Sequence, residues 1–202
     1  MANILTRFCK AVFAPENVAC DRLFVRPARH SDVIRENDGD MWSVMFRARS
    51  LNPGENIDLT ERALSENVNR GAVLVAEESG KITGFGIIDR TFIDGRDIPC
   101  VHDLFISPEA SQTRTIDALI TGFAKQLRAQ GIETMFVFCK QDEAAFDSVC
   151  SRYDAGRYTF IDYTDSDIQA YRINGLTDKF SQNRSRYDSS MPVPITKPGL
   201  RK

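Results

Sequence analysis

The sequence predicts an α+β fold of three layers, in which helices flank a mixed central β-sheet. Strand-like and helix-like segments alternate along the 202 residues, which favours a sheet covered by helices. The run TMFVFC at residues 134–139 is apolar throughout, as expected of a strand that is buried on both faces. A composition that is 42% hydrophobic and 27% charged fits one globular domain with a well-filled core.

The first part of this domain is expected to hold one strand and three helical segments. The apolar run Leu23–Arg26 is followed by Pro27, after which Ser31 is the expected N-cap of a short helix. Residues 39–50 carry apolar side chains on one side of a second helix. A third helix has apolar residues at helical spacing up to Val68 and ends near a glycine.

The next part gives the clearest strand signals. The runs Val73–Glu77 and Ile82–Arg90 are joined by a short polar link, which indicates a β-hairpin. The remaining expected elements are a strand at Ile98–Ile106, a long helix from Thr113 to about Gln130 that Gly131 ends, a strand at 134–139, a helix at 143–153 and two closing strands at 158–165 and 168–173.

An extension is expected at each side of the domain. Apolar residues at helical spacing predict an N-terminal amphipathic helix in residues 1–21, and basic residues within it exclude a signal peptide or a membrane span. Residues 177–202 form a basic, Pro-containing tail of formal charge +4 whose prolines exclude a regular helix. By composition this tail is extended, and it is either solvated or ordered by binding. The domain itself spans residues 22–176.

Charge and cysteine usage limit the compartment and the partners. The formal net charge of −2 argues against nucleic acid or a membrane surface as a partner of the whole chain. The five cysteines are odd in number, widely spaced and without a C-x-x-C pair, which predicts reduced thiols and no zinc site. We therefore expect an intracellular, cytoplasmic protein without a metal.

The order of the expected elements resembles the Gcn5-related N-acetyltransferase (GNAT) family over residues 22–173. The segment VLVAEESGKITGFGIID at 73–89 is similar to the second and third strands of that family. The segment VHDLFISPE at 101–109 resembles the strand that opens its coenzyme site. The resemblance implies acetyl-CoA as the acyl donor and backbone groups of Leu104 and Ile106 as the holders of its pantetheine arm.

The loop after Pro108 is a degenerate version of the acetyl-CoA loop of the family. Glycines there let backbone N–H groups close on a diphosphate at a helix N-terminus. Here Ser111, Gln112 and Arg114 occupy the loop, and Ile116 stands at the position of the second required glycine. Arg114 can instead reach an anion through its guanidinium, or it is a solvated residue at the start of the helix.

The resemblance also implies a base and an acid. Asp103 and His102 are the candidates for removing a proton from an amine, and as neighbours on a strand they are expected to point to opposite faces. Tyr153 is the candidate for protonating the leaving thiolate, although it lies one place out of the family's register. Each of the three is otherwise an ordinary rim or core residue.

These observations support two hypotheses for the function. The first hypothesis, favoured by the glycine-free loop, is a non-catalytic structural or interaction component of a larger assembly such as a virion, with no cofactor. Protein partners would then dock the N-terminal helix and the 177–202 tail. The alternative is an acyl-CoA-dependent N-acyltransferase with an atypical diphosphate loop.

Overall fold

The computed structural model describes residues 22–33, 40–51, 59–93, 95–140, 144–153, 155–158 and 168–176. The predicted N-terminal helix and the 177–202 tail lie outside these ranges, as does the predicted strand at 158–165 apart from its first residue. The described elements, in chain order, are β1 (Leu23–Pro27), α1 (His30–Val33), α2 (Met41–Leu51), α3 (Glu61–Asn69), β2 (Val73–Glu78), β3 (Lys81–Ile93), β4 (Arg96–Ile106), α4 (Gln112–Arg128), β5 (Thr134–Lys140), α5 (Ala144–Cys150), the 3-10 turn η1 (Ser151–Tyr153), β6 (Gly156–Tyr158) and β7 (Ile168–Asn174).

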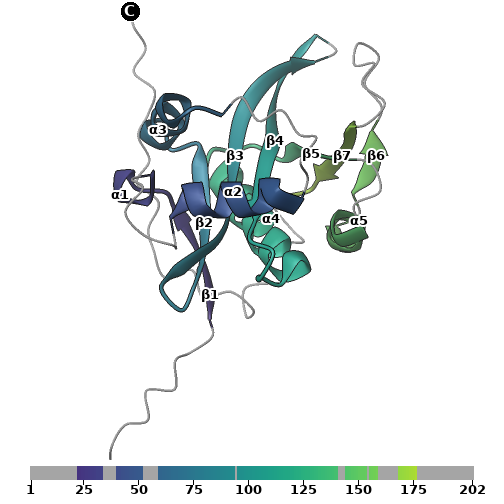
Figure 1. Cartoon of the computed structure of the whole chain (residues 1–202). Coiled ribbons are helices and arrows are strands. Elements are labelled where there is room, and N and C mark those ends of the chain that lie inside the picture. The colour runs from purple at the N-terminus through teal and green to yellow at the C-terminus, as the bar shows by residue number, and fades with distance from the viewer. Residues whose placement is uncertain are drawn as a thin grey trace, which may run out of the picture.

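The strands form one mixed sheet in the order β1-β2-β3-β4-β5-β7-β6 (Figure 1). Neighbouring strands are antiparallel except β4 and β5, which are parallel and are connected through α4. The predicted α+β class with a mixed central sheet is therefore confirmed. The ends of β3 and β4 extend past β2, whose first residue pairs with Ile87, and form a two-stranded arm that is longer than the sequence predicted.

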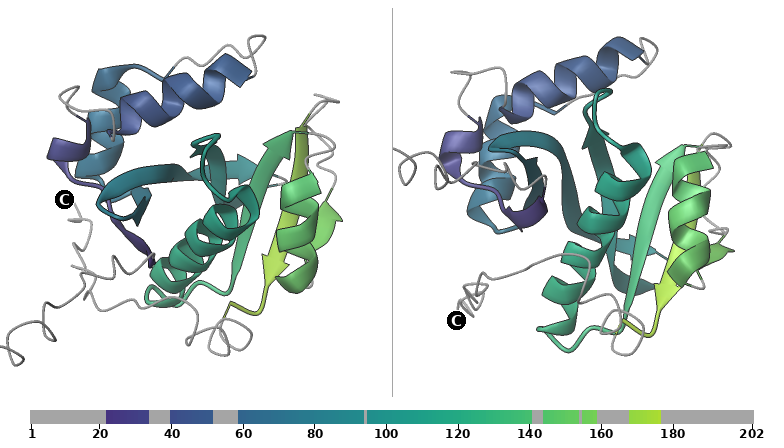
Figure 2. Two further views of the ribbon diagram at one scale, coloured as in Figure 1. Left: turned by 60° about the horizontal axis from the view of Figure 1, so that its bottom comes forward. Right: turned by 90° about the horizontal axis from the view of Figure 1, so that it is seen from below.

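Helices cover the two faces of the sheet, with α2 and α4 on opposite sides (Figure 2). The buried side of α4 holds Leu119, Ile120 and Phe123, which join one core cluster with residues of β1, β2 and β4. On the other face, residues of α2 and α3 pack on β2, β3 and β4 around Phe85. Each helix supplies an apolar stripe at helical spacing, which is why the sequence pattern identified it.

Two glycines of β3 let α4 lie close to the sheet. A Cβ atom added at Gly84 would come within 2.8 Å of Thr115 Cγ2, and one at Gly86 within 2.8 Å of Phe123 Cε2. These distances are shorter than real Cβ contacts, so both positions require glycine for packing. The N-terminal turn of α4 is thereby held against β3 and the end of β4.

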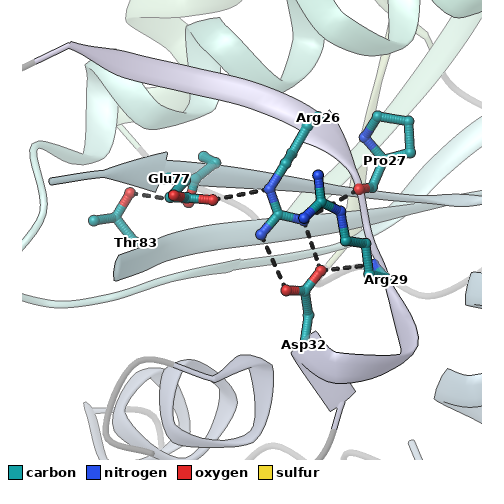
Figure 3. Close-up of polar contacts among 7 residues, drawn as sticks. Arg26, Pro27, Arg29, Asp32, Glu77 and Thr83 are labelled. Carbon is teal, nitrogen blue, oxygen red and sulfur yellow. Dashed lines mark hydrogen bonds and ion pairs between the residues drawn. The ribbon is translucent and has the colours of Figure 1, made fainter. Parts of the chain in front are cut away.

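A charge network ties the edge strand β1 to α1 and β2 (Figure 3). Arg26 donates to both carboxylate oxygens of Asp32, at 2.7 and 3.0 Å, and to Glu77 Oε2 at 2.8 Å. Asp32 also accepts the N–H of Arg29 at 2.6 Å, and its pKa is lowered because these hydrogen bonds outweigh its burial. The helix begins at His30, so Ser31 lies inside it and the predicted N-cap role of Ser31 is wrong. Instead, the carboxylate of Asp32 in the first turn accepts the hydrogen bond from the N–H group of Arg29 at the start of the helix.

Candidate functional site

The parallel strands β4 and β5 stay paired over only a short stretch. The register joins Cys100 with Phe136 and Val101 with Val137. Beyond Val101, β4 continues to Ile106 along β3 alone, and no described strand pairs with its other edge. The two strands therefore separate toward their C-terminal ends and leave an open edge on β4. Ligands of parallel sheets bind at such carboxyl ends.

The open edge presents the backbone of two predicted cofactor-binding residues. Ser107 N–H donates to Thr83 O on β3 at 2.8 Å. Because backbone groups alternate in direction along a strand, Phe105 also faces β3, while Leu104 and Ile106 turn their N–H and C=O groups toward the open side. Their side chains pack against the α4 core. Hydrogen bonding at this edge is therefore available to a ligand whatever the side chains are.

A β-bulge brings His102 and Asp103 together. Ile88 pairs with Val101 and Ile87 pairs with Asp103, so His102 is an extra residue between two paired positions. The expectation that adjacent strand residues point to opposite faces is wrong here, because the extra residue breaks the alternation. The imidazole Nδ1 of His102 lies 2.8 Å from Asp103 Oδ2, and each side chain is 37% exposed.

The contact with Asp103 determines the pKa of the His102 imidazole and which of its nitrogen atoms can exchange a proton. The hydrogen bond to Asp103 raises the pKa of His102 above its ordinary 6.5, with a further electrostatic contribution from Asp89 that sequence reasoning missed. Burial acts in the opposite direction and is outweighed. With Nδ1 held by a carboxylate, the Nε2 atom is the one left for proton exchange. Such a pair can accept a proton from a bound amine.

The turn that follows β4 leads into α4 without a side-chain cap. Ser111 occupies the N-cap position, and its hydroxyl does not bond to the first-turn N–H groups. The first turn contains Gln112 and Arg114, and its N–H groups have no acceptor within the helix. A helix start of this kind favours an anion.

The side chains of Arg114 and Ile116, both in the first turns of α4, point away from the N-terminal end of the helix. Ile116 is 2% exposed and belongs to the core beneath α4. Arg114 extends outward, and its guanidinium lies 2.8 Å from Glu78 Oε1 at the end of β2. The sequence reasoning did not find Glu78, which is 36 residues distant and follows no motif. The isoleucine side chain therefore does not crowd the backbone N–H groups at the start of α4, contrary to what the sequence suggested.

Tyr153, the last residue of η1, lies in the core and contacts α4. Its hydroxyl donates to Asp117, which is 1% exposed, and lies 3.0 Å from Thr121 Oγ1. Arg152 approaches the same carboxylate at 3.4 Å. In this arrangement the phenol is 2% exposed and serves a buried hydrogen-bond network. The role of Tyr153 as an acid stays a prediction.

Comparison with solved structures identifies the architecture. The chain superposes on the PaiA N-acetyltransferase of Thermoplasma acidophilum in complex with coenzyme A, with a TM-score of 0.57, 13% identity, and coverage of 75% of this chain and 98% of that one. It also matches yncA of Salmonella typhimurium with acetyl-CoA (TM-score 0.56, 15% identity, 75% and 93% covered). A GNAT-family acetyltransferase of Streptococcus agalactiae gives a TM-score of 0.59 at 10% identity, with 75% and 95% covered. The chain has the GNAT fold.

Comparisons by sequence add nothing to this assignment. No family model matches the chain, and no curated protein matches it. Among the described residues, no helix of this GNAT-fold chain is long and apolar enough to span a membrane. The resemblance inferred from the order of elements is therefore confirmed by the fold alone.

Proposed function

We propose that this GNAT-fold chain is an acyl-CoA-dependent N-acyltransferase that uses His102 and Asp103 to deprotonate the acceptor amine. The observation that carries the proposal is the bulge of β4, which places this pair beside the open edge of the same strand. His102 precedes Leu104 by two residues, which corresponds to about 7 Å along a strand. A base and a binding edge are thus joined on one rigid element.

The residues present fit an acyl-CoA. The outward backbone groups of Leu104 and Ile106 suit the amide groups of a pantetheine arm, which would add to the sheet edge as a strand does. The first-turn N–H groups of α4, at Gln112 and Arg114, suit the diphosphate, and Ile116 is buried away from them. Ser111 and the Arg114 guanidinium are the side chains expected to assist. Bound there, the coenzyme supplies an acyl group activated as a thioester.

The chain supplies the proton acceptor. The Nδ1–H group of His102 donates to Asp103, which leaves the Nε2 lone pair free to accept the proton that an amine loses as its nitrogen bonds to the acyl carbon. The bond from that carbon to sulfur would break, and the proton would pass from His102 through solvent to the released thiolate. The raised pKa of His102 makes it a stronger base, and it acts in the neutral form. Activity should therefore rise with pH through the pKa of this imidazole.

The test is thiol release from acetyl-CoA with a panel of primary amines, measured on the full chain. His102→Gln should lower kcat/KM by about 10²- to 10⁴-fold, the usual contribution of a general base. His30→Gln is the matched control, since His30 is the other histidine of the chain and contacts Asn69 far from β4 in sequence. Equal activity of the two variants would refute the assigned role, and no turnover with any amine would refute the proposed activity.

A second candidate function is a GNAT-fold component of an assembly that binds partners without catalysis. The turn after β4 favours it, because Glu109 there places a carboxylate near the start of α4, where it accepts from Ser107 and lies 3.7 Å from Arg47. An acid at this point opposes a bound diphosphate. The engaged hydroxyl of Tyr153 favours the same reading.

A further inference from the structure

A cavity lies at the C-terminal end of α4, at the opposite end of that helix from Ser111, Gln112 and Arg114. Its volume is about 530 Å³. Three parts of the chain line it: the α3–β2 connection at residues 69–72, the base of the β3–β4 arm, and the last turn of α4. The cavity exists because β3 and β4 continue past the first residue of β2, so that Ile88 and Asp89 pair with β4 and no described strand pairs with the other edge of β3 there.

The lining combines an apolar floor with a polar rim. Ile88, Pro99 and Leu127 supply apolar surface. Gln126 donates its Nε2 to Gly71 O at 2.8 Å, which orients its amide, and its Oε1 atom is buried without a donor within the described ranges. A buried acceptor without a partner costs free energy, so a ligand with an N–H group is favoured.

The rim carries both signs of charge. Arg70 lies 3.6 Å from Asp89, and Arg90 lies 2.7 Å from Asp97. All four side chains are about half exposed, so these pairs are weak and can exchange partners. A segment that carries an aromatic residue, backbone N–H groups and both kinds of charge matches this lining better than a simple ion does.

Such a segment leaves the described structure next to the cavity. Leu176 is fully buried, and its N–H donates to Glu133 O at 3.2 Å. Glu133 follows Gln130 of the cavity wall by three residues. The next residues read Thr-Asp-Lys-Phe, and an extended chain carries Phe180 up to about 14 Å from Leu176.

We propose that this cavity binds residues 177–183 of the same chain, with Phe180 on the apolar floor and a backbone N–H group on Gln126 Oε1. Asp178 and Lys179 then meet the mixed charges of the rim. This docking is independent of acyl transfer.

The test is hydrogen–deuterium exchange of the full chain and its Phe180→Ser variant. The amides of Ala72 and Gln130 report on the cavity, because both are hydrogen-bonded at helix ends beside it. Loss of the aromatic anchor should speed their exchange about tenfold, while the β2 amides stay unchanged. Tyr187→Ser is the matched control and should change neither set.

Three results would overturn the proposal. Unchanged exchange at Ala72 and Gln130 in Phe180→Ser would show that the phenylalanine does not occupy the cavity. Faster exchange throughout the domain would show a general loss of stability. Protection that grows with protein concentration would assign the cavity to the segment of a second copy.

Discussion

The open edge of β4 and the turn that follows it are adjacent in the chain and differ in what makes them suitable for a ligand. The edge offers backbone groups of Leu104 and Ile106, whose direction depends on strand register and not on side-chain identity. In the GNAT family the turn and the helix start after it rely on glycines, and here α4 has Arg114 and Ile116 at those positions. A feature built from backbone geometry tolerates substitution, whereas a feature built from the absence of a side chain does not.

The structure makes the difference between the edge and the helix start smaller at Ile116. Ile116 belongs to the core, so its side chain holds α4 on the sheet and does not project into the turn. The glycines of the region instead stand in β3, where Gly84 and Gly86 allow the close approach of α4. These glycines serve the packing of α4 on the sheet and do not replace the glycines of an acetyl-CoA loop.

The largest expected effect is that of Ile116→Gly, which places a glycine where the GNAT family has one. Ile116→Gly removes a fully buried side chain and introduces glycine into a helix, so it should lower the free energy of unfolding by about 3–6 kcal/mol. Ile116→Val, the matched control, should cost about 0.5–1.5 kcal/mol. Urea denaturation measures both. A stable Ile116→Gly chain that binds CoA more tightly would show that the isoleucine had crowded the site.

A smaller effect is expected at Arg114. If its guanidinium assists the diphosphate, Arg114→Ala should raise the Kd of CoA about tenfold, as loss of one charged hydrogen bond does. Glu78→Gln frees the guanidinium from its exposed ion pair and should lower the Kd about two- to fivefold. Arg62→Ala on α3 is the control, because its exposed pair with Glu66 lies on another helix. Opposite or absent responses would assign Arg114 to the surface pair alone.

The smallest effect is a shift in pH dependence. Removing the hydrogen-bonding carboxylate with Asp103→Asn should lower the pKa of His102, since the hydrogen bond that raises it is lost and burial then dominates. The kcat/KM profile moves to lower pH in the same variant. Nuclear magnetic resonance titration can separate His102 from His30, the other histidine. An unchanged pKa would mean that Asp103 does not hold the imidazole.

The same pair contributes to stability with a defined sign. Because the folded-state pKa of His102 is raised, its contribution is fully present below pH 6.5 and is lost as the pH rises through the folded-state value. The free energy of unfolding of the wild type should therefore fall over that interval. Asp103→Asn should show no such decrease.

The fold was predictable from the sequence because it depends on local periodicity and on order. Runs of β-forming residues joined by short polar links identified β2, β3 and β4, and the helical spacing of Leu119, Ile120 and Phe123 identified α4. The site was only partly predictable. The bulge at His102 arises from the register between two strands, and the burial of Tyr153 depends on Asp117, 36 residues away. Neither leaves a local pattern in the sequence.

Isothermal titration of CoA into the full chain tests the central claim most directly, since acyl transfer requires that β4 and the start of α4 hold the coenzyme together. We expect saturable binding with a Kd of about 1 μM to 1 mM, in the range usual for enzyme substrates. Pantetheine, which lacks the diphosphate, should bind the same edge more weakly. A folded chain that gives no heat with millimolar CoA would contradict the account and favour the non-catalytic function.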